Sequence, residues 1–323
     1  MSSINLFEKE IEHVGIGLHR PECVLTQRNG DIYVSDFRGG VTQISHTGEQ
    51  HLLAGKCADV KEGILQTNGF AIKGDDSFLI AHLGAEEGGV FELTREGQVS
   101  PFLQTIGGID LPPTNFVHID HQARIWITVS TRQQPRAKGY SPLCNDGFII
   151  LVENNNATVV ADGIGYTNEC WVTPDGKFLY ANATFTRELF RWDITDSGQL
   201  INKQLFATFR EGTFPDGLVG DISGNLWVTS IISNRVIRIS PNGACEVYLE
   251  ISDDTHIANA EKAYQDYAMG REHLGSNPAQ LKNISSLAFG GKHGDDMYLG
   301  CLLDQRIIKI PSTGFVGHKP VHW

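Results

Sequence analysis

Five oxygen-bearing polar residues recur at a nearly constant distance before the central residue of a strand-like run. Glu22, Asn68, Asn115 and Asp216 precede Tyr33, Leu79, Trp126 and Trp227 by eleven positions, and Asn168 precedes Tyr180 by twelve. Near the same place in a sixth copy lies Ser285 or Asn283. Carboxylate and amide oxygens without His or Cys are the hard donors that calcium prefers, and magnesium or manganese also accept them. Zn²⁺ is a further alternative. Capping of tight turns by Asn and Asp is the competing interpretation for any single position.

The central residues belong to six apolar runs of period two that predict half-buried strands. These runs are 30–36, 76–82, 123–129, 177–183, 225–231 and 296–302. Each is followed by a second such run, at 40–45, 89–94, 147–152, 188–194, 235–240 and 306–311. A weaker third run often follows, and an alternating segment ending in an Asp, Gly or Asn turn precedes each copy. Six copies of a unit of four antiparallel strands predict an all-β, six-bladed β-propeller.

The spacing of the copies supports this interpretation. Successive central residues are 46, 47, 54, 47 and 71 positions apart, with Tyr298 as the last. The third interval contains a loop rich in Gly, Lys, Arg and Pro, from Arg132 to Pro142. The fifth contains an insertion over about 252–282, where apolar residues near a helical period predict one short amphipathic helix around 255–275. The insertion is open to interpretation as a lid, an interface or, by default, a long loop.

The ends of the chain suggest how the ring closes. Residues around Ile4 to Val14 are expected to supply the outer strand of the blade begun at the other end. No linker divides the chain, so residues 1–323 are expected to form a single domain. Because the first strand of each propeller blade lines the central channel, the five polar residues are expected to converge there. Burying two carboxylates at one level is costly unless a cation pairs with them.

Composition excludes several other classes of function. The net charge of −12 argues against a nucleic-acid partner, which requires a basic surface. No run approaches the ~20 apolar residues of a membrane span. The charged start of the chain does not resemble an export signal. Six scattered cysteines without a CxxC pair predict reduced thiols rather than disulfides or a zinc site, and a cytoplasmic location is expected.

Three motifs carry a resemblance to a known family. Pro21-Glu22, Thr167-Asn168-Glu169 and Pro215-Asp216-Gly217, each before a strand of the type described, resemble the senescence-marker-protein, gluconolactonase and luciferin-regenerating-enzyme family. The resemblance covers nearly the whole chain. It implies a six-bladed propeller with a divalent metal, commonly calcium, in its channel, and hydrolysis of lactones or of some organophosphates. By matching position it implies metal ligands at Glu22, Asn168 and Asp216, with Asn115 as a fourth ligand or a substrate-orienting amide.

One departure from the family bears on the substrate. Sugar-lactonase members carry an Arg two residues before the position of Asn115, and this chain has Pro113. Their acidic residue for sugar hydroxyls, about eighteen positions further on, falls near Arg132-Gln133 here. The expected substrate is therefore a lactone or ester other than a typical sugar-acid lactone. Asn68, Asn115, His118 and Arg132 are the expected substrate-binding residues.

The predicted reaction is metal-assisted opening of a cyclic ester by water. The cation would act as the Lewis acid, and Asp216 is the predicted base, with Glu22 as the alternative. His19, His82 and His118 are alternative bases, although a solvated or carboxylate-paired role is expected for each. The absence of a G-x-S-x-G motif disfavours a serine nucleophile. Two other functions stay open: a non-catalytic calcium-binding or interaction propeller, and an organophosphate hydrolase. A condensing, strictosidine-synthase-like propeller is disfavoured because it would have a lone Glu without the amides.

Overall fold

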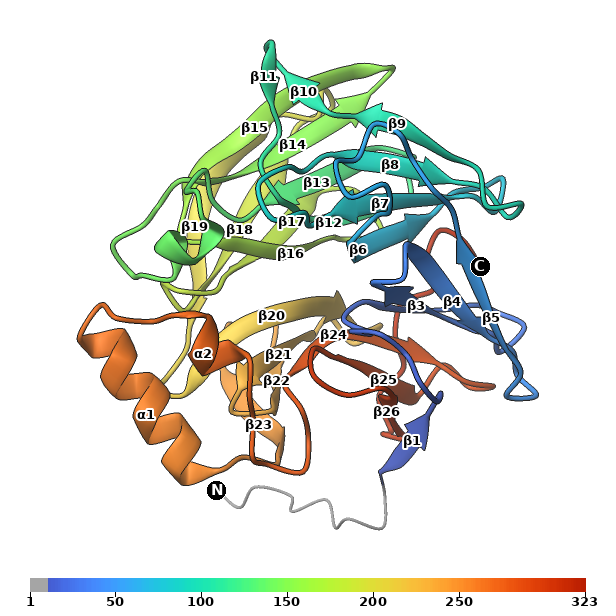
Figure 1. The fold of residues 1–323 in the computed structure, drawn as a ribbon. Coiled ribbons are helices and arrows are strands. Elements are labelled where there is room, and N and C mark those ends of the chain that lie inside the picture. The colour runs from blue at the N-terminus through green and yellow to red at the C-terminus, as the bar shows by residue number, and fades with distance from the viewer. Residues whose placement is uncertain (1–10) are drawn as a thin grey trace.

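The computed structural model describes residues 11–323 and is a six-bladed β-propeller of four-stranded antiparallel sheets (Figure 1). The innermost strands are β2 (Val24–Thr26), β6 (Thr67–Ile72), β12 (Thr114–Ile119), β16 (Thr167–Val172), β20 (Thr213–Gly220) and β24 (Ile284–Gly290). The second strands are β3 (Ile32–Asp36), β7 (Phe78–His82), β13 (Ile125–Val129), β17 (Phe178–Ala183), β21 (Leu226–Ile232) and β25 (Asp296–Cys301). Each second strand lies within the run predicted for it or ends within one residue of that run.

The outer half of each blade completes the predicted meander. The third strands are β4 (Gly40–Ile44), β8 (Val90–Leu93), β14 (Gly147–Glu153), β18 (Glu188–Ile194), β22 (Arg235–Ile239) and β26 (Ile307–Ile310). The fourth strands are β5 (Gln50–Ala54), β9 (Val99–Leu103), β15 (Asn156–Ile164), β19 (Leu200–Thr208), β23 (Cys245–Glu250) and β1 (Glu12–Val14). A small hairpin of β10 (Thr105–Ile106) and β11 (Ile109–Asp110) follows β9.

The two ends of the chain share the last blade. Strand β1 pairs antiparallel with β26, with Val14 opposite Ile307, and thereby supplies the outer strand of the blade formed by β24 to β26. Residues 4–14 were expected to close the ring in this way, and the pairing confirms the prediction for Glu12–Val14. The part of that prediction before residue 11 lies outside the described residues.

Two tryptophans show how the strands are fixed to the turns that precede them. Trp126 and Trp227 are fully buried at the centres of their second strands. The indole Nε1–H of Trp126 donates to Asp120 (2.9 Å), and that of Trp227 donates to Asp221 (2.9 Å). Each Asp begins the turn that leads from the first strand to the second. A buried indole N–H requires such a partner, so the repeated Asp and Trp fix the hairpin in two blades.

The insertion between the fifth and sixth blades is helical. Helix α1 (Asp254–Gln265) begins at Asp253, whose side chain accepts from the backbone N–H of His256 (2.7 Å), and its buried face includes Ala260 and Ala263. The predicted helix is therefore confirmed. A second helix, α2 (Arg271–Leu274), is one turn long, too short to produce a periodic pattern. Among the described residues no helix is long and apolar enough to cross a membrane.

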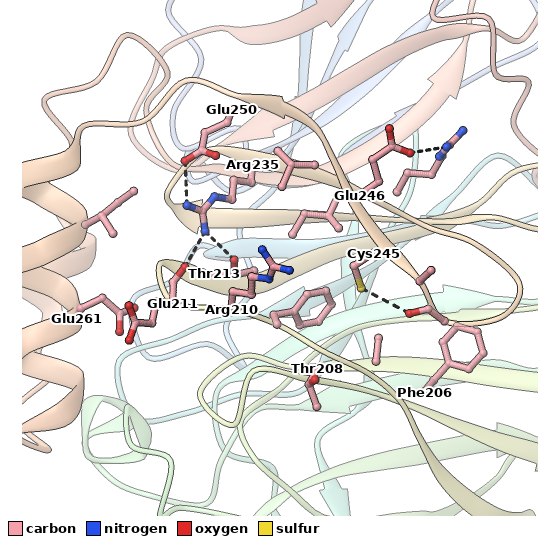
Figure 2. A pocket seen from close by; sticks show the side chains of 18 of the residues that line it. Phe206, Thr208, Arg210, Glu211, Thr213, Arg235, Cys245, Glu246, Glu250 and Glu261 are labelled. Atoms are coloured by element: carbon pink, nitrogen blue, oxygen red, sulfur yellow. Dashed lines mark hydrogen bonds and ion pairs between the residues drawn. The ribbon is translucent and has the colours of Figure 1, made fainter. Parts of the chain in front are cut away.

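A groove of about 2140 Å³ lies between the outer strands β19 and β23 and helix α1 (Figure 2). Four of its charged side chains are paired with one another. Arg235 donates to Glu250 (2.9 Å) and to Thr213 (2.9 Å), and Arg238 pairs with Glu246. The groove is a wedge between the outer edges of two blades, so it lies away from the channel where the sequence predicts the site.

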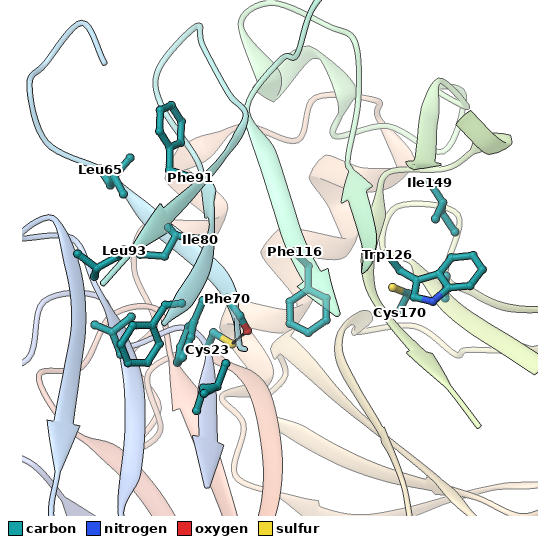
Figure 3. Close-up of a cluster of buried hydrophobic side chains, with 14 of the residues drawn as sticks. Cys23, Leu65, Phe70, Ile80, Phe91, Leu93, Phe116, Trp126, Ile149 and Cys170 are labelled. Carbon is teal, nitrogen blue, oxygen red and sulfur yellow. Dashed lines mark hydrogen bonds between the residues drawn. The ribbon is translucent and has the colours of Figure 1, made fainter. Parts of the chain in front are cut away.

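The hydrophobic core lies between the blades, around the inner strands. In the largest cluster Phe70, Phe116 and Cys170 come from three successive inner strands, and Cys23 lies just before a fourth (Figure 3). All six cysteines are free, and four of them are buried. The thiols therefore serve as small apolar side chains, as the sequence predicts.

Candidate functional site in the central channel

The strand register places the polar residues at equivalent positions of the six blades. In each blade one inner-strand residue pairs with the central residue of the second strand; these partners are Leu25, Ala71, His118, Trp171, Val219 and Ala288. Three residues before them come, in the same order, Glu22, Asn68, Asn115, Asn168, Asp216 and Ser285. We call these six residues the channel ring. The sixth member is thus Ser285 and not Asn283, and the fourth and sixth blades depart from the spacing of eleven because their hairpins are longer.

A backbone irregularity accompanies the channel ring. In five blades the pairing of the first and second strands shifts at the ring residue, as between Thr67 and Phe70 or between Pro215 and Leu218. A β-bulge redirects a side chain that regular alternation would point elsewhere. All six ring residues are buried, with at most 7% of the surface exposed. In five blades, therefore, the same kind of register shift accompanies a buried polar side chain.

Hydroxyl groups that directly follow two of the second strands orient two of the amides. Asn168 Nδ2 donates to Thr184 Oγ1 (3.1 Å), and that hydroxyl itself donates to the Pro215 carbonyl (2.8 Å). Because the Thr184 proton is used in this way, its oxygen must accept from the amide nitrogen. Asn115 Nδ2 likewise lies 3.0 Å from Ser130 Oγ. The Oδ1 atoms of Asn115 and Asn168 are buried and without a partner among the described residues, so two carbonyl oxygens are free to act as ligands.

Arg20 connects the first two members of the ring. Its guanidinium pairs with the Glu22 carboxylate and donates to Asn68 Oδ1 (2.7 Å), while it lies over the Phe37 ring at 4.6 Å. Asn68 Nδ2 donates to the Asn115 carbonyl (3.0 Å), so both ends of the Asn68 amide are engaged. No sequence pattern predicts this role, because Arg20 lies outside the repeated unit.

Burial and neighbouring carboxylates raise the pKa of two acidic groups in the site, Asp216 and Glu169. Burial, and next the charge of Glu22, raise the pKa of Asp216 to about 8. Burial also holds the pKa of Glu169 well above its usual range, although Glu169 Oε2 accepts from the Leu218 N–H (2.9 Å). Glu169 follows Asn168 directly and was not among the predicted site residues. Acidic groups crowded in this way are stabilised by a bound cation.

One end of the channel is framed by aromatic side chains and the insertion. Tyr140, from the loop after β13, stacks on Phe185 (4.9 Å between ring centroids) and meets Tyr166 edge-on (5.3 Å). Helix α1 is held there by an ion pair between Glu261 and Arg187 and by a bond from the Tyr264 hydroxyl to the Phe185 carbonyl (2.8 Å). The insertion is therefore a packed part of this end and not the long loop taken as the default.

The other end is crossed by the C-terminal segment, which ends beside the first blade (Figure 1). His322 Nε2 lies 3.0 Å from the Thr26 carbonyl, which also accepts from the Trp323 indole (2.6 Å), and His318 stacks on Trp171. Between this segment and the inner strands lies a cavity of about 110 Å³ lined by Glu169 and His118. The C-terminal segment thus covers the channel at this end.

His118, a predicted substrate-binding residue, lies in that lower cavity. Its Nε2 accepts from the Val172 N–H (3.4 Å). Burial lowers the pKa of His118 to about 4; the charges of His121 and His322 lower it further and that of Asp120 opposes them. His118 is therefore neutral at pH 7, one level below the channel ring.

The depressed pKa of His118 predicts sensitivity to acid. The unfolded chain takes up this proton below about pH 6.5 and the folded protein only near pH 4, so His118 stabilises the fold above pH 6.5 and progressively loses that effect as the pH falls to 4. The urea midpoint of His118→Gln should therefore fall less than that of the wild type between pH 7 and pH 4.5. If the urea midpoints of the two proteins fell equally with pH, His118 would not be the group whose protonation destabilises the fold.

Arg132, also predicted to bind substrate, is engaged at the surface. Its guanidinium bonds both carboxylate oxygens of Asp162 (2.9 and 2.8 Å) and covers the Phe148 ring at 4.1 Å. No contact with the channel ring is present among the described residues. Of the seven predicted site residues, the structure brings together Glu22, Asn68, Asn115, Asn168 and Asp216, and it places His118 and Arg132 apart from them.

The channel ring fits a hard divalent cation. It offers two carboxylates and two unpartnered amide oxygens at one level, the oxygen donors typical of calcium. No group of three or more His, Cys, Asp or Glu suited to a metal occurs within the described residues. The channel ring is not such a group, because its two carboxylates are completed by amide oxygens.

Comparison with known proteins agrees with this geometry. The family described as "SMP-30/Gluconolactonase/LRE-like region" matches residues 21–260, which include five of the six ring positions. The chain is 27% identical over 178 residues to the 6-deoxy-6-sulfogluconolactonase of Pseudomonas putida, a match that covers 54% of this chain and 57% of that protein. The chain thus spans about half the length of the curated relatives it matches.

Two solved structures share the fold over nearly the whole chain. A gluconolactonase from Xanthomonas campestris superposes with a TM-score of 0.68 at 16% identity, covering 93% of this chain and 88% of that one. The calcium-binding protein regucalcin from Agrobacterium tumefaciens superposes with a TM-score of 0.66 at 17% identity, covering 95% of both chains. At these identities the likeness establishes the architecture.

Proposed function

We propose, from the premise that this chain belongs to the SMP-30/gluconolactonase/LRE-like family, that it is a divalent-metal-dependent hydrolase that opens lactones. The observation that carries the proposal is the pair of unpartnered amide oxygens, on Asn115 and Asn168, beside two buried carboxylates. A purely structural ring would be expected to satisfy those oxygens internally. The lactonase name of a curated relative supports the reaction class.

Glu22, Asn168 and Asp216 are the proposed ligands, and Asn115 is the fourth. Calcium is the expected ion, because the donors are all oxygens and calcium accepts them in flexible arrangements, whereas magnesium demands a near-ideal octahedron. When bound, the cation would polarise the lactone carbonyl and stabilise the negative charge that develops on its oxygen. Arg20 holds Glu22 and Asn68 in place around it.

Asp216 is the proposed base. One of its oxygens serves as a ligand, and the other accepts a proton from a water molecule while the water oxygen attacks the lactone carbonyl carbon. The ring C–O bond then breaks, and the departing alkoxide takes that proton, so the product is the open hydroxy acid and Asp216 is again a carboxylate. Glu22 is less suited to this role because Arg20 already pairs with its carboxylate.

The substrate is proposed to differ from a typical sugar-acid lactone. Pro113 stands where sugar lactonases of the family carry Arg, and the buried aromatic cluster of Tyr140, Tyr166 and Phe185 lies at the other end of the channel from the C-terminal segment. Aromatic faces pack against apolar or planar groups better than against a fully hydroxylated ring. The proposed substrate is therefore a less hydroxylated lactone.

A substrate panel tests the proposal. Lactones, acyclic esters and fluorophosphates would be offered to the calcium-loaded protein, to the protein after chelation, and to chelated protein supplied with Ca²⁺, Mg²⁺, Mn²⁺ or Zn²⁺. Calcium-restored hydrolysis of lactones is the expected result. A preference for fluorophosphates would instead favour an organophosphate hydrolase, and calcium binding without turnover of any compound would favour a binding propeller.

A further inference from the structure

Arg136 lies at the aromatic end of the channel, above the proposed metal site. It begins the short 3₁₀-helix η2 (Arg136–Gly139) in the loop after β13. The two residues that anchor this helix, Ala137 and Tyr140, pack against Tyr166 and Phe185, and Tyr166 lies two positions before Asn168 of the channel ring. The loop is therefore packed against the segment that leads into Asn168.

Arg136 lies close enough to the channel ring for its charge to act on two ring carboxylates, Glu22 and Asp216. Its electrostatic partners are Tyr166, Tyr140 and Glu22, and its charge acts in turn on Asp216. No carboxylate lies within ion-pair distance of it among residues 11–323. Arg20, Arg132 and Arg187, by contrast, each have such a partner. Arg136 is thus a half-buried cation at the channel end whose donors are not committed to a carboxylate.

The charge balance of the site indicates what this cation is for. Arg20 is already paired with Glu22, whereas Arg136 has no carboxylate partner among residues 11–323. A divalent cation on the ring would add two positive charges beside Arg136. A loaded site of this kind attracts an anion through the channel end. A guanidinium held above the metal also offers paired donors suited to an oxyanion.

We propose that Arg136 is the specificity residue for an anionic substituent on the lactone, a carboxylate or a sulfonate, held while the metal site engages the ring carbonyl. This inference rests on the proposed function, because it assumes a cation on Glu22 and Asp216. It also offers a reason why Pro113 can replace the arginine of sugar lactonases. In this chain the arginine that recognises the substrate would be Arg136, which comes from another segment of the same blade and binds a charged group instead of hydroxyls.

The test compares matched ligands that differ in one charge. A five-membered lactone with a ring carboxylate, its methyl ester and its sulfonate counterpart would be assayed with calcium-loaded wild type, Arg136→Gln and Arg136→Lys. Arg136→Gln should lose roughly 10- to 100-fold in kcat/KM on the carboxylate, mainly through KM, since one charge-assisted interaction is lost. The methyl ester should change little, and Arg136→Lys should recover part of the loss. The sulfonate arm shows whether planar and tetrahedral anions are both accepted.

The control is Arg28→Gln, which removes the same charge from an exposed arginine that makes no ion pair in the described part of the chain. It should behave as the wild type. Calorimetric binding of the corresponding lactam carboxylate and lactam methyl ester gives a readout that does not require turnover. An equal loss on carboxylate and ester in Arg136→Gln, or a wild type that binds both lactams alike, would overturn the inference.

The two hypotheses fail in different ways. Calcium-dependent opening of the methyl ester without an Arg136-dependent charge preference would leave the lactonase proposal intact and refute the role of Arg136. Hydrolysis of no lactone by the loaded protein would refute the lactonase proposal itself. A calorimetric preference for the lactam carboxylate that disappears in Arg136→Gln would then still support anion recognition at this site.

Discussion

Asp216→Asn is expected to lower the rate of lactone opening by roughly 1,000-fold, the effect typical of a lost general base. The substitution keeps the size of the side chain and removes its charge, so the packing around Phe214 and the Pro215 backbone should persist. It also removes one of the two carboxylates proposed to hold the cation, so calcium affinity should fall as well. The measurements are kcat on the best lactone of the panel and calcium binding by calorimetry.

The matched control for this prediction is Asp162→Asn. Asp162 is an exposed carboxylate that pairs with Arg132 at the surface, so its loss should leave both the rate and the calcium affinity unchanged. Calcium bound normally by an inactive Asp216→Asn protein would identify Asp216 chiefly as the base. Undiminished turnover in that variant would contradict both roles.

Gly300→Ala should displace the backbone of Glu22, a member of the channel ring, although Gly300 itself is not a ring residue. A Cβ added at Gly300 on β25 would lie 1.8 Å from the carbonyl oxygen of Glu22 and 2.9 Å from that of Pro21. Both neighbours are backbone, so neither can move aside as a flexible side chain would. The same Glu22 carbonyl accepts from Ser285 Oγ (2.7 Å) and from the Ser286 N–H (3.2 Å). The methyl group must therefore displace the segment that carries a proposed ligand.

We expect Gly300→Ala to lower the free energy of unfolding by about 1–3 kcal/mol, as overpacking of a core does. It should also weaken calcium binding, because Glu22 shifts with its backbone. Gly74→Ala is the control, since a Cβ there meets nothing within 4 Å and the residue does not require a positive φ. Urea unfolding and calorimetry measure the two effects. A Gly300→Ala protein as stable and as calcium-competent as Gly74→Ala would contradict the predicted contact.

Much of the architecture could be predicted because it repeats. The period-two runs and their spacing locate the second strands of all six blades, and five ring positions follow from counting back from them. A departure from the repeat explains why the sequence left two candidates, Ser285 and Asn283, in the sixth blade. Its hairpin from Ala288 to Tyr298 is two residues longer than that from Leu25 to Tyr33, so counting alone does not reach Ser285.

What could not be predicted lies in segments that occur only once. Arg20 reaches the ring from a loop whose path depends on tertiary packing, and sequence spacing says nothing about where a long side chain ends. Arg132 has the residue type expected of a substrate-binding group, yet its salt bridge to Asp162 takes it to the surface. The closing of the channel by the C-terminal segment also leaves no periodic signal.

The most direct test of the central claim is a calcium titration of metal-stripped protein in which the rate of lactone opening is followed. If the channel ring holds the ion required for catalysis, the stripped protein should be inactive, and the rate should rise in proportion to added calcium until one ion is bound per chain. The same titration of Asp216→Asn should give no comparable rise. Full activity in the stripped wild type, unaffected by added calcium, would contradict the account.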